Sequence, residues 1–542
     1  MESIRKAAVI GAGTMGAAIA AQFANAGVPV LLLDIVKDGA ANAIAKMLKT
    51  EPAPFMSKRA AKLVTPGNIE DDLPQLASCD WVVEAIIERL DLKQDLYRKI
   101  DAMRRPDTAV SSNTSTIPLA KLTEGMPESF KHDFLITHFF NPPRYMRLLE
   151  LVTGPETDPD LAAKVENFSD LMLGKSVVKA KDSPGFIANR LGVFWLQTGV
   201  IGAMDAGLTV EEADAIMGRP FGIPKTGVFG LIDLVGLDLM PHINASLAGS
   251  LPASDAFHAT NRDLPLIKKM IAEGYTGRKG KGGFYRKSAK GREAIELASG
   301  DYRPVQKAKA PESRDLREIL SESRYAWRVM GQTLAYAASL VPEAAEDIHA
   351  IDEAMRLGYN WKSGPFELID KIGADWLAEK LAADNLPVPA LLTAAKGKSF
   401  YRTEDGTREY LGTDGAYHKL ARPAGVLMLE DIKRTAKPLL KNASAAVWDI
   451  GDGVLCFELT SKSSSWDQQN LEILDRAIDL VSQNHKALVI YNESTHFSAG
   501  ANLGLALFAA NIAAWGEIDK LVASGQRIFK KLKYASFPSV AA

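Results

Sequence analysis

The stretch KAAVIGAGTMGAAIAAQFANAGVPVLLLD, residues 6–34, decides the fold of the N-terminal part of the chain. Its first apolar run predicts a buried strand, a glycine-rich turn then opens a helix, and VPVLLLD predicts a second strand. Further strand patterns at 80–86, 108–115 and 133–140 end in polar residues and alternate with helical stretches. This alternation predicts a parallel α/β sheet, in which ligands bind at the carboxyl ends of the strands.

The turn has the spacing G-x-G-x-x-G, with Gly11, Gly13 and Gly16. The first glycine makes the tight turn, the second lets the backbone approach a pyrophosphate, and the third lets the helix pack closely on the strand. Thr14 and Met15 fall at the start of the predicted helix, where free N–H groups and a partial positive charge suit phosphates. The motif therefore predicts a dinucleotide site.

Asp34 ends the second predicted strand, about 20 residues past the motif, where a carboxylate accepts hydrogen bonds from ribose hydroxyls. A carboxylate there repels a 2′-phosphate, which favours NAD over NADP. Glu84, Glu88 and Lys93 lie in or after the strand pattern at 80–86. Two interpretations of these three stay open: an ion pair on a helix face, or the lining of the nicotinamide–ribose end of the cleft.

The stretch ITHFFNPPRYMRLLELV, residues 136–152, holds His138, one of 8 histidines in the chain. A histidine suits the removal of a hydroxyl proton while hydride leaves the same carbon. The prolines would turn the chain so that MRLLELV runs back past His138 and brings Glu150 within reach to fix the tautomer. Asn141 and the cluster SSNTST at 111–116 are candidates to hold substrate oxygens.

Composition bounds the remaining function classes. At roughly 100–200 residues per domain, 542 residues predict three or four domains. A net charge of −2 argues against a nucleic-acid or membrane-surface role. Cys79 and Cys456 are too few for a disulfide framework or a metal site, so we expect a reducing, cytoplasmic location and no metal. The N-terminus does not resemble a signal peptide, and no apolar run of about 18 residues predicts a transmembrane helix.

Helical periodicity replaces the strand patterns after KDSPGFIANR, residues 181–190. VFGLIDLVGLD (228–238) returns as PFELIDKIGAD (365–375), and KGGFYR (281–286) is echoed by GKSFYR (397–402), which predicts a duplicated helical domain. A hairpin pattern around GDG, an amphipathic helix and a strand then predict a new α/β domain. The predicted divisions are 1–185 (α/β), 186–290 (helical), 291–315 (linker), 316–435 (second helical) and 440–542 (α/β).

The chain resembles the 3-hydroxyacyl-CoA dehydrogenase family over about residues 4–286. The pieces that carry the resemblance are VIGAGTMG, VVEAIIE, SSNTS, THFFNPP, LLELV, DSPGFIANR and GRKGKGGFY. The repeat and the last domain resemble multifunctional β-oxidation enzymes with an enoyl-CoA hydratase (crotonase) domain placed last. The resemblance implies a Rossmann-type NAD-binding domain, two helical dehydrogenase C-terminal domains and an incomplete crotonase-like domain.

The resemblance also implies roles for single residues. His138 becomes the general base and Glu150 its orienting partner. The other implied contacts are Ser115 and Asn141 with the substrate and the histidine, Asn189 with the same site from the helical domain, and Glu88 and Lys93 with the cofactor. The implied reaction is the oxidation of an (S)-3-hydroxyacyl-CoA thioester to 3-ketoacyl-CoA with NAD in fatty-acid β-oxidation. A thiolase partner and a homodimer stay open, and Lys46 and Lys49 are weak candidates for binding CoA.

FSAGANL resembles the crotonase oxyanion loop, in which the N–H of Ala501 would bind a thioester oxygen. The family's second donor and its glutamates lie further downstream, so we expect hydration only in a longer form, which would be a bifunctional hydratase and dehydrogenase. Three alternatives remain: a dehydrogenase of free 3-hydroxy acids, a lyase or isomerase, and a non-catalytic binding protein. Related free-acid enzymes generally use a lysine, so the His138–Glu150 pair argues against a dehydrogenase of free 3-hydroxy acids. The presence of both residues also argues against a non-catalytic binding protein.

Overall fold

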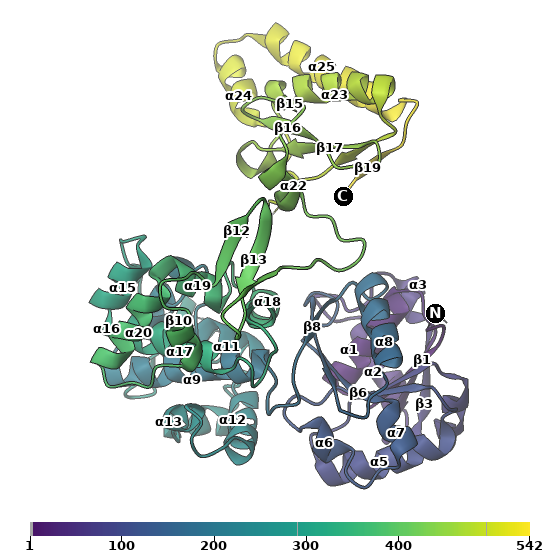
Figure 1. Cartoon of the computed structure of the whole chain (residues 1–542), viewed down its shortest axis with the longest axis vertical. Helices are drawn as coiled ribbons and strands as arrows, with labels where there is room; N and C mark the ends of the chain where they lie inside the picture. The colour runs from purple at the N-terminus through teal and green to yellow at the C-terminus, as the bar shows by residue number, and fades with distance from the viewer. Residues whose placement is uncertain (1–3, 290, 495) are drawn as a thin grey trace. The chain divides into compact units, whose positions relative to one another are not determined.

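The computed structural model describes residues 4–289, 291–494 and 496–542. The chain divides into two compact units, which we describe separately (Figure 1). The first comprises Met1–Tyr401 with Tyr410–Tyr417, and the second comprises Arg402–Glu409 with His418–Ala542. Every candidate dehydrogenase residue lies in the first unit, and Ala501 lies in the second.

The first unit begins with an eight-stranded sheet in the order β3-β2-β1-β4-β5-β6-β7-β8. Its strands are β1 (Ala7–Ile10), β2 (Val30–Asp34), β3 (Val64–Asn68), β4 (Trp81–Glu84), β5 (Ala109–Ser112), β6 (Phe134–Phe139), β7 (Leu148–Thr153) and β8 (Ser176–Lys179). The first six are parallel, as the sequence predicted. β7 runs antiparallel to β6, and β8 follows β7 in parallel. The carboxyl ends of β1, β4, β5 and β6 therefore meet at one edge of a Rossmann-like sheet.

Helices cover both faces of this sheet. They are α1 (Thr14–Asn25), α2 (Gly39–Met47), α3 (Lys58–Ala61), α4 (Ile69–Asp72), η1 (Leu73–Ser78), α5 (Leu90–Met103), α6 (Leu119–Leu122), α7 (Glu128–His132) and α8 (Pro159–Leu171). Leu149 and Leu151 of β7 pack in one core with α1 and α8, whereas Leu148 and Val152 join a second core that continues into the helical region. Because strand side chains alternate between faces, Glu150 lies on the face that the helical region covers.

The next segment is mostly helical, with α9 (Ala188–Ala206), α10 (Val210–Ile216), η2 (Arg219–Phe221), α11 (Phe229–Val235), α12 (Leu239–Ser250), α13 (Phe257–Thr260) and α14 (Pro265–Ala272). It ends in a three-stranded sheet of β9 (Tyr285–Ser288), β10 (Gly291–Ile295) and β11 (Tyr302–Pro304). The sequence predicted a linker over residues 291–315, but the structure forms β10 and β11 within this range. Their lysines and arginines suggested solvated chain, but Ala294 and Ile295 are buried, and the charged residues lie on a short strand.

A second helical segment follows, with α15 (Leu316–Glu322), α16 (Arg324–Ala326), η3 (Trp327–Gly331), α17 (Gln332–Ser339), α18 (Ile348–Tyr359), α19 (Pro365–Ile372), α20 (Ala374–Ala383) and α21 (Ala390–Ala394). Two contacts within the first helical segment recur in this second segment. An aspartate accepts the N–H groups of a Phe-Tyr pair twice: Asp233 from Phe284 and Tyr285, and Asp370 from Phe400 and Tyr401. An edge-to-face phenylalanine pair also occurs twice: Phe229–Phe284 at 4.7 Å and Phe366–Phe400 at 4.8 Å.

Three short strands, β12 (Tyr401–Glu404), β13 (Thr407–Leu411) and β14 (Tyr417–Lys419), form the sheet where the chain passes from the first unit to the second. The second unit holds a five-stranded sheet with β15 (Leu440–Lys441), β16 (Ala445–Asp449), β17 (Val454–Leu459), β18 (Ala487–Ile490) and β19 (Ser539–Ala541). Its other elements are α22 (Leu429–Thr435), η4 (Lys462–Ser464), α23 (Gln468–Asn484), α24 (Leu503–Asn511) and α25 (Trp515–Lys533). β16 and β17 pair in antiparallel fashion around GDG, so the predicted hairpin is confirmed.

Candidate active site

The glycine turn between β1 and α1 has the shape that the motif predicted. Gly11 has φ +102°, and a Cβ there would lie 2.5 Å from the carbonyl oxygen of Ala85. A side chain at Gly16 would collide with the Gly11 carbonyl oxygen. By contrast, a Cβ at Gly13 would meet no atom within 4 Å. The fold therefore requires the outer two glycines, whereas Gly13 leaves open space at the N-terminus of α1, where a pyrophosphate fits.

Asp34 supports this turn from the end of β2. Its Oδ2 accepts the N–H of Ala12 at 2.7 Å, and its Oδ1 accepts the N–H of Val36 at 2.8 Å. Each carboxylate oxygen has two lone pairs, so the half-buried side chain keeps acceptor capacity for ribose hydroxyls. The predicted ribose contact stays a prediction, and the structure adds the role of holding the turn.

Lys93 of α5 lies at the centre of a buried ion pair. Its Nζ is 2.7 Å from Glu84 Oε1 and 3.3 Å from Glu88 Oε2, and its side chain is only 1% exposed. Glu84 also accepts hydrogen bonds from Tyr97 and Ser112, each at 2.7 Å. The predicted ion pair is therefore confirmed, but it is buried between the end of β4 and α5 and does not lie on a helix face, and carboxylates enclose the cationic end of Lys93.

Glu88 fixes the loop after β5. Its Oε1 accepts hydrogen bonds from the Thr114 hydroxyl at 2.6 Å and from the N–H groups of Ser115 at 3.0 Å and Thr116 at 3.1 Å. Burial opposes ionisation of Glu88, but the Lys93 charge and these hydrogen bonds hold its pKa below the ordinary value. The anchored loop places Ser115 at the carboxyl edge of the sheet.

His138 and Glu150 face each other across β6 and β7. They are partners in the antiparallel register, and His138 Nδ1 lies 2.8 Å from Glu150 Oε2. Both side chains are buried, with Glu150 0% exposed. The predicted reversal of the chain after the prolines is thus confirmed. Because a carboxylate only accepts hydrogen bonds, Nδ1 carries the proton, and Nε2 is left to exchange a proton with another group.

The second oxygen of Glu150 binds the start of α9. Oε1 accepts the N–H groups of Ile187 at 3.1 Å and Ala188 at 2.8 Å. The partial positive charge at a helix N-terminus stabilises a carboxylate in this position. Sequence reasoning missed these two donors, although DSPGF ahead of a long helical pattern was a signal for a helix start near Glu150.

Aromatic rings and an asparagine surround the histidine. The His138 ring lies 4.6 Å from the ring of Phe140 and 5.8 Å from that of Phe186. Asn113 Oδ1 accepts the N–H of Phe139 at 2.9 Å, which ties the loop after β5 to the end of β6. These contacts join the Ser115 loop to the histidine and enclose the imidazole in an apolar setting.

The other predicted dehydrogenase residues lie around this centre. Ser115 and Asn189 are half-buried, and Asn141 is exposed. Within the described chain, the three side chains form no hydrogen bonds to other residues, which leaves them available to a substrate. Asn189 directly follows Ala188, and Asn141 begins the turn after β6. Ala501 is exposed in the second unit, where it forms a bridge with Trp466.

Lys175 holds the turn that follows His138, and sequence reasoning missed it. Its side chain is buried, and Nζ donates to the carbonyl oxygens of Pro143 and, at 2.9 Å, Met146. Nζ also lies 5.6 Å from the centre of the Phe139 ring. Burial lowers the pKa of Lys175 to about 8. Lys175 therefore braces the turn that carries Asn141.

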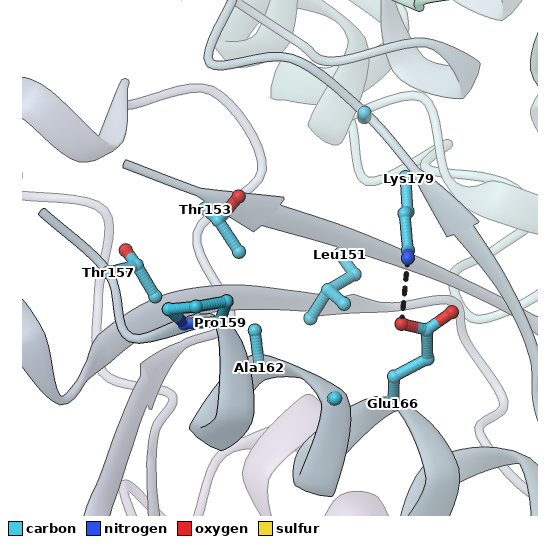
Figure 2. A pocket seen from close by; sticks show the side chains of 9 residues that line it. Leu151, Thr153, Thr157, Pro159, Ala162, Glu166 and Lys179 are labelled. Carbon is cyan, nitrogen blue, oxygen red and sulfur yellow. Dashed lines mark ion pairs between the residues drawn. The ribbon is translucent and has the colours of Figure 1, made fainter. Parts of the chain in front are cut away.

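A cavity of about 250 Å³ lies on the opposite face of β7 (Figure 2). Leu151 lines it together with residues of α8, and Glu166 and Lys179 form an ion pair at 2.9 Å beside it. Since Leu151 and Glu150 point to opposite faces, this cavity is separate from the histidine. Across the described residues, no group of three or more His, Cys, Asp or Glu side chains is arranged to hold a metal ion, and no helix is long and apolar enough to cross a membrane.

Comparison with protein families matches two models. The 3-hydroxyacyl-CoA dehydrogenase NAD-binding domain matches residues 6–183, and the C-terminal domain of that family matches 185–287 and 325–401. A probable 3-hydroxyacyl-CoA dehydrogenase of Bacillus subtilis (strain 168) is 36% identical over 99% of this chain and 73% of its own length. A putative fatty acid oxidation complex trifunctional enzyme of Rickettsia prowazekii (strain Madrid E) is 35% identical over 98% and 73%.

A solved structure shares the fold of the larger part of the chain. It is 3-hydroxybutyryl-CoA dehydrogenase from Escherichia coli K12 substr. MG1655, with a TM-score of 0.56 and 22% identity over 72% of this chain and 98% of that one. The glycine turn fits NAD, the cofactor named by the matching N-terminal family. The chain belongs to the 3-hydroxyacyl-CoA dehydrogenase family and is an NAD-dependent oxidoreductase.

Proposed function

We propose that the protein oxidises (S)-3-hydroxyacyl-CoA to 3-ketoacyl-CoA in fatty-acid oxidation, with His138 and Glu150 as the catalytic pair. The observation that carries the proposal is the 2.8 Å contact between His138 Nδ1 and Glu150 Oε2 at the carboxyl edge of the sheet. The names of the relatives, a probable 3-hydroxyacyl-CoA dehydrogenase and a fatty acid oxidation complex enzyme, support the substrate class.

In the proposed mechanism, His138 Nε2 takes the proton of the 3-hydroxyl group as hydride leaves C3. Bound NAD supplies the hydride acceptor. Glu150 holds the imidazole with Nε2 free and stabilises the imidazolium that forms. The N–H groups of Ile187 and Ala188 at the start of α9 hold the Glu150 carboxylate in place. In the reverse direction, protonated His138 donates to the 3-keto oxygen.

The cofactor would lie along the glycine turn. Gly11, Gly13, Thr14, Met15 and Gly16 form the turn and the start of α1 that would take the pyrophosphate. We propose that the Asp34 carboxylate accepts hydrogen bonds from the ribose hydroxyls. Glu88 and Lys93 contribute through the loop that they hold, because the Lys93 ammonium is enclosed by two carboxylates.

The substrate would lie against three polar side chains around the dyad. In this proposal, Ser115 and Asn141 donate hydrogen bonds to the reacting oxygen or the thioester, and Asn189 does so from the start of α9. Ser115 and Asn189 are half-buried and lack hydrogen-bond partners within the described chain, which supports this role because polar groups shielded from water normally pair.

We also propose that the two helical segments, predicted at 186–290 and 316–435 and matched by the C-terminal family domain at 185–287 and 325–401, are copies of one helical domain. The matching aspartate contacts and phenylalanine pairs support the duplication, as does the double match to the C-terminal domain of the family. In the second unit, we propose a crotonase-like domain in which the Ala501 N–H binds a thioester oxygen. The trifunctional name of the Rickettsia prowazekii relative supports an added activity.

The test is NADH consumption with acetoacetyl-CoA by the wild-type protein and by His138→Ala. We expect the variant to lose about 100-fold or more of the rate, the usual contribution of a general acid–base group. NADH binding, followed by its fluorescence, should be unchanged in the variant. Similar rates for both proteins would overturn the role of His138, and no turnover by the wild type with short- and long-chain ketoacyl-CoA would overturn the proposed reaction.

A further inference from the structure

The second helical segment reaches the active site, although the reaction as written uses none of its residues. Helix α18 packs against β7, β8 and α9. β7 carries Glu150, and the start of α9 binds its carboxylate. A Cβ at Gly358, next to the end of α18, would lie 2.8 Å from Leu148 Cδ2 and 3.7 Å from Phe140 Cε1. The absence of a side chain therefore lets the α18 backbone lie against Phe140, whose ring covers His138.

Tyr359, the last residue of α18, packs on α9, the helix whose start binds Glu150, the other partner of the dyad. Its ring occupies the space that a side chain at Gly192 would take, directly against α9. Gly192 is one helical turn from Ala188, so the two lie on the same face of α9. Ala188 is the residue whose N–H binds Glu150. Burial raises the pKa of the Tyr359 phenol, and the Glu150 charge adds to this rise.

The same segment anchors the start of α9 and the chain that leads into it. Arg190 is fully buried and donates to the Tyr336 hydroxyl at 2.8 Å and to Glu343 at 2.7 Å. The N–H of Lys181 donates to the Ala344 carbonyl oxygen at 2.9 Å. The helix N-terminus that fixes Glu150 is thus held from the second segment on both sides of Ala188.

We propose that the end of α18 forms the back wall of the active site, and that Tyr359 is a positioning residue that shields the Glu150 carboxylate from water. The inference rests on the proposed role of the His138–Glu150 dyad. It assigns the second helical segment a part in the reaction, because the attraction between Glu150 and the imidazolium is stronger in a dry setting than in a wet one.

The direction of the effect follows from what Tyr359 covers. Among the described residues, His138 of β6 contacts Glu150 directly, and the Glu150 charge acts on Tyr359 of α18. Removal of the Tyr359 ring admits water beside Glu150, but Phe140 and Phe186 still cover His138. The attraction that favours protonated His138 is weakened, while the desolvation of the ring is unchanged. Protonated His138 is therefore lost at a lower pH.

The experiment is the pH profile of acetoacetyl-CoA reduction by Tyr359→Ala, Tyr359→Leu and Tyr359→Phe. The rate falls as pH rises through the loss of the proton donor. We expect the midpoint of this fall to move down by about one pH unit in the alanine and leucine variants. In Tyr359→Phe, which keeps the ring, the midpoint should stay at the wild-type value, and NADH affinity should be unchanged in all three. The leucine variant decides the question if the alanine variant does not fold.

Tyr325→Ala is the matched control. Tyr325 also comes from the second segment and packs on α9, but at Gly202, roughly 15 Å further along the helix than Gly192 at 1.5 Å per residue. We expect it to lower stability and leave the midpoint unchanged. An unchanged or raised midpoint in both Tyr359→Ala and Tyr359→Leu would overturn the inference. His138→Ala in the same assay tests the dyad separately: if that variant keeps its activity, the proposed function has failed, whatever the Tyr359 variants do.

Discussion

At the residue scale, contacts from distant parts of the chain hold the side chains of the proposed dyad. His138, Glu150 and the glycine motif could be recognised because strand patterns and local spacing place them at one edge of a sheet. The groups that fix them come from far away in the chain: the N–H of Ala188 binds Glu150, and Lys175 braces the turn after His138. Such contacts depend on tertiary packing: a local pattern such as DSPGF indicates that a helix starts, but not which side chain its N–H groups bind.

Lys175 gives a prediction for the pH dependence of stability. Its ordinary pKa of 10.5 in the unfolded chain falls to about 8 in the fold. Between these values the unfolded chain binds a proton that the folded chain has released, so stability rises with pH over this window. The cost of burying the ammonium, about 3 kcal/mol below pH 8, is relieved as the pH approaches 10.5.

The measurement compares wild type with Lys175→Met by denaturant unfolding from pH 7 to 10.5. We expect the free energy of unfolding of the wild type to rise relative to the variant by about 3 kcal/mol over the range. In the difference between the two free energies of unfolding, the contributions of all groups that titrate alike in both proteins cancel. Parallel curves would show that Lys175 does not release its proton in this window.

At the element scale, the glycines of the turn between β1 and α1 have different roles: the fold requires Gly11 and Gly16, whereas Gly13 leaves space for a ligand. A Cβ at Gly13 meets nothing within 4 Å, so Gly13→Ala should keep the thermal stability of the wild type. It fills the space into which a pyrophosphate would fit, and we expect NADH affinity to fall at least about tenfold, a loss of about 1.4 kcal/mol. NADH fluorescence titration and a thermal melt measure the two effects.

Gly249→Ala is the control for that experiment. Gly249 lies inside α12, and a Cβ there would also meet no atom within 4 Å. The substitution should leave NADH affinity unchanged and slightly raise stability, because alanine favours a helix over glycine. Full NADH affinity in Gly13→Ala would contradict the placement of the pyrophosphate.

The strands and the longer helices were predictable at this scale, because their hydrophobic periodicity is strong. The strands β1, β2, β4, β5 and β6 and the hairpin of β16 and β17 fall where the patterns placed them. The linker predicted at 291–315 was wrong where β10 and β11 form. A strand of five residues or fewer that carries charged side chains has a composition close to that of a linker, and only the pairing of β10 with β9 and β11 distinguishes it.

At the scale of the whole molecule, the two compact units predict two unfolding events. The glycine turn lies in the first unit, so NADH should stabilise that unit alone. At a concentration 100 times its Kd, a ligand adds about 2.7 kcal/mol. We expect differential scanning calorimetry to show one transition that rises by a few °C with NADH and one that does not move. A single transition, or two that rise together, would contradict independent units.

The proposed internal duplication could be inferred from the sequence because two landmarks recur in order. The packing of the second helical segment against the active site could not be predicted, because Tyr359 and Glu150 lie more than two hundred residues apart and no local pattern links them. Only the fold brings α18 against β7 and α9.

The central claim, that His138 and Glu150 act as one catalytic unit, is tested most directly by a double-mutant cycle. The measurement is kcat/KM for acetoacetyl-CoA reduction by His138→Ala, Glu150→Gln and the double variant. Each single variant should lose about 100-fold or more. If Glu150 acts through His138, the double variant stays within about twofold of His138→Ala. Losses that multiply in the double variant would contradict the claim, because the two residues would then act independently.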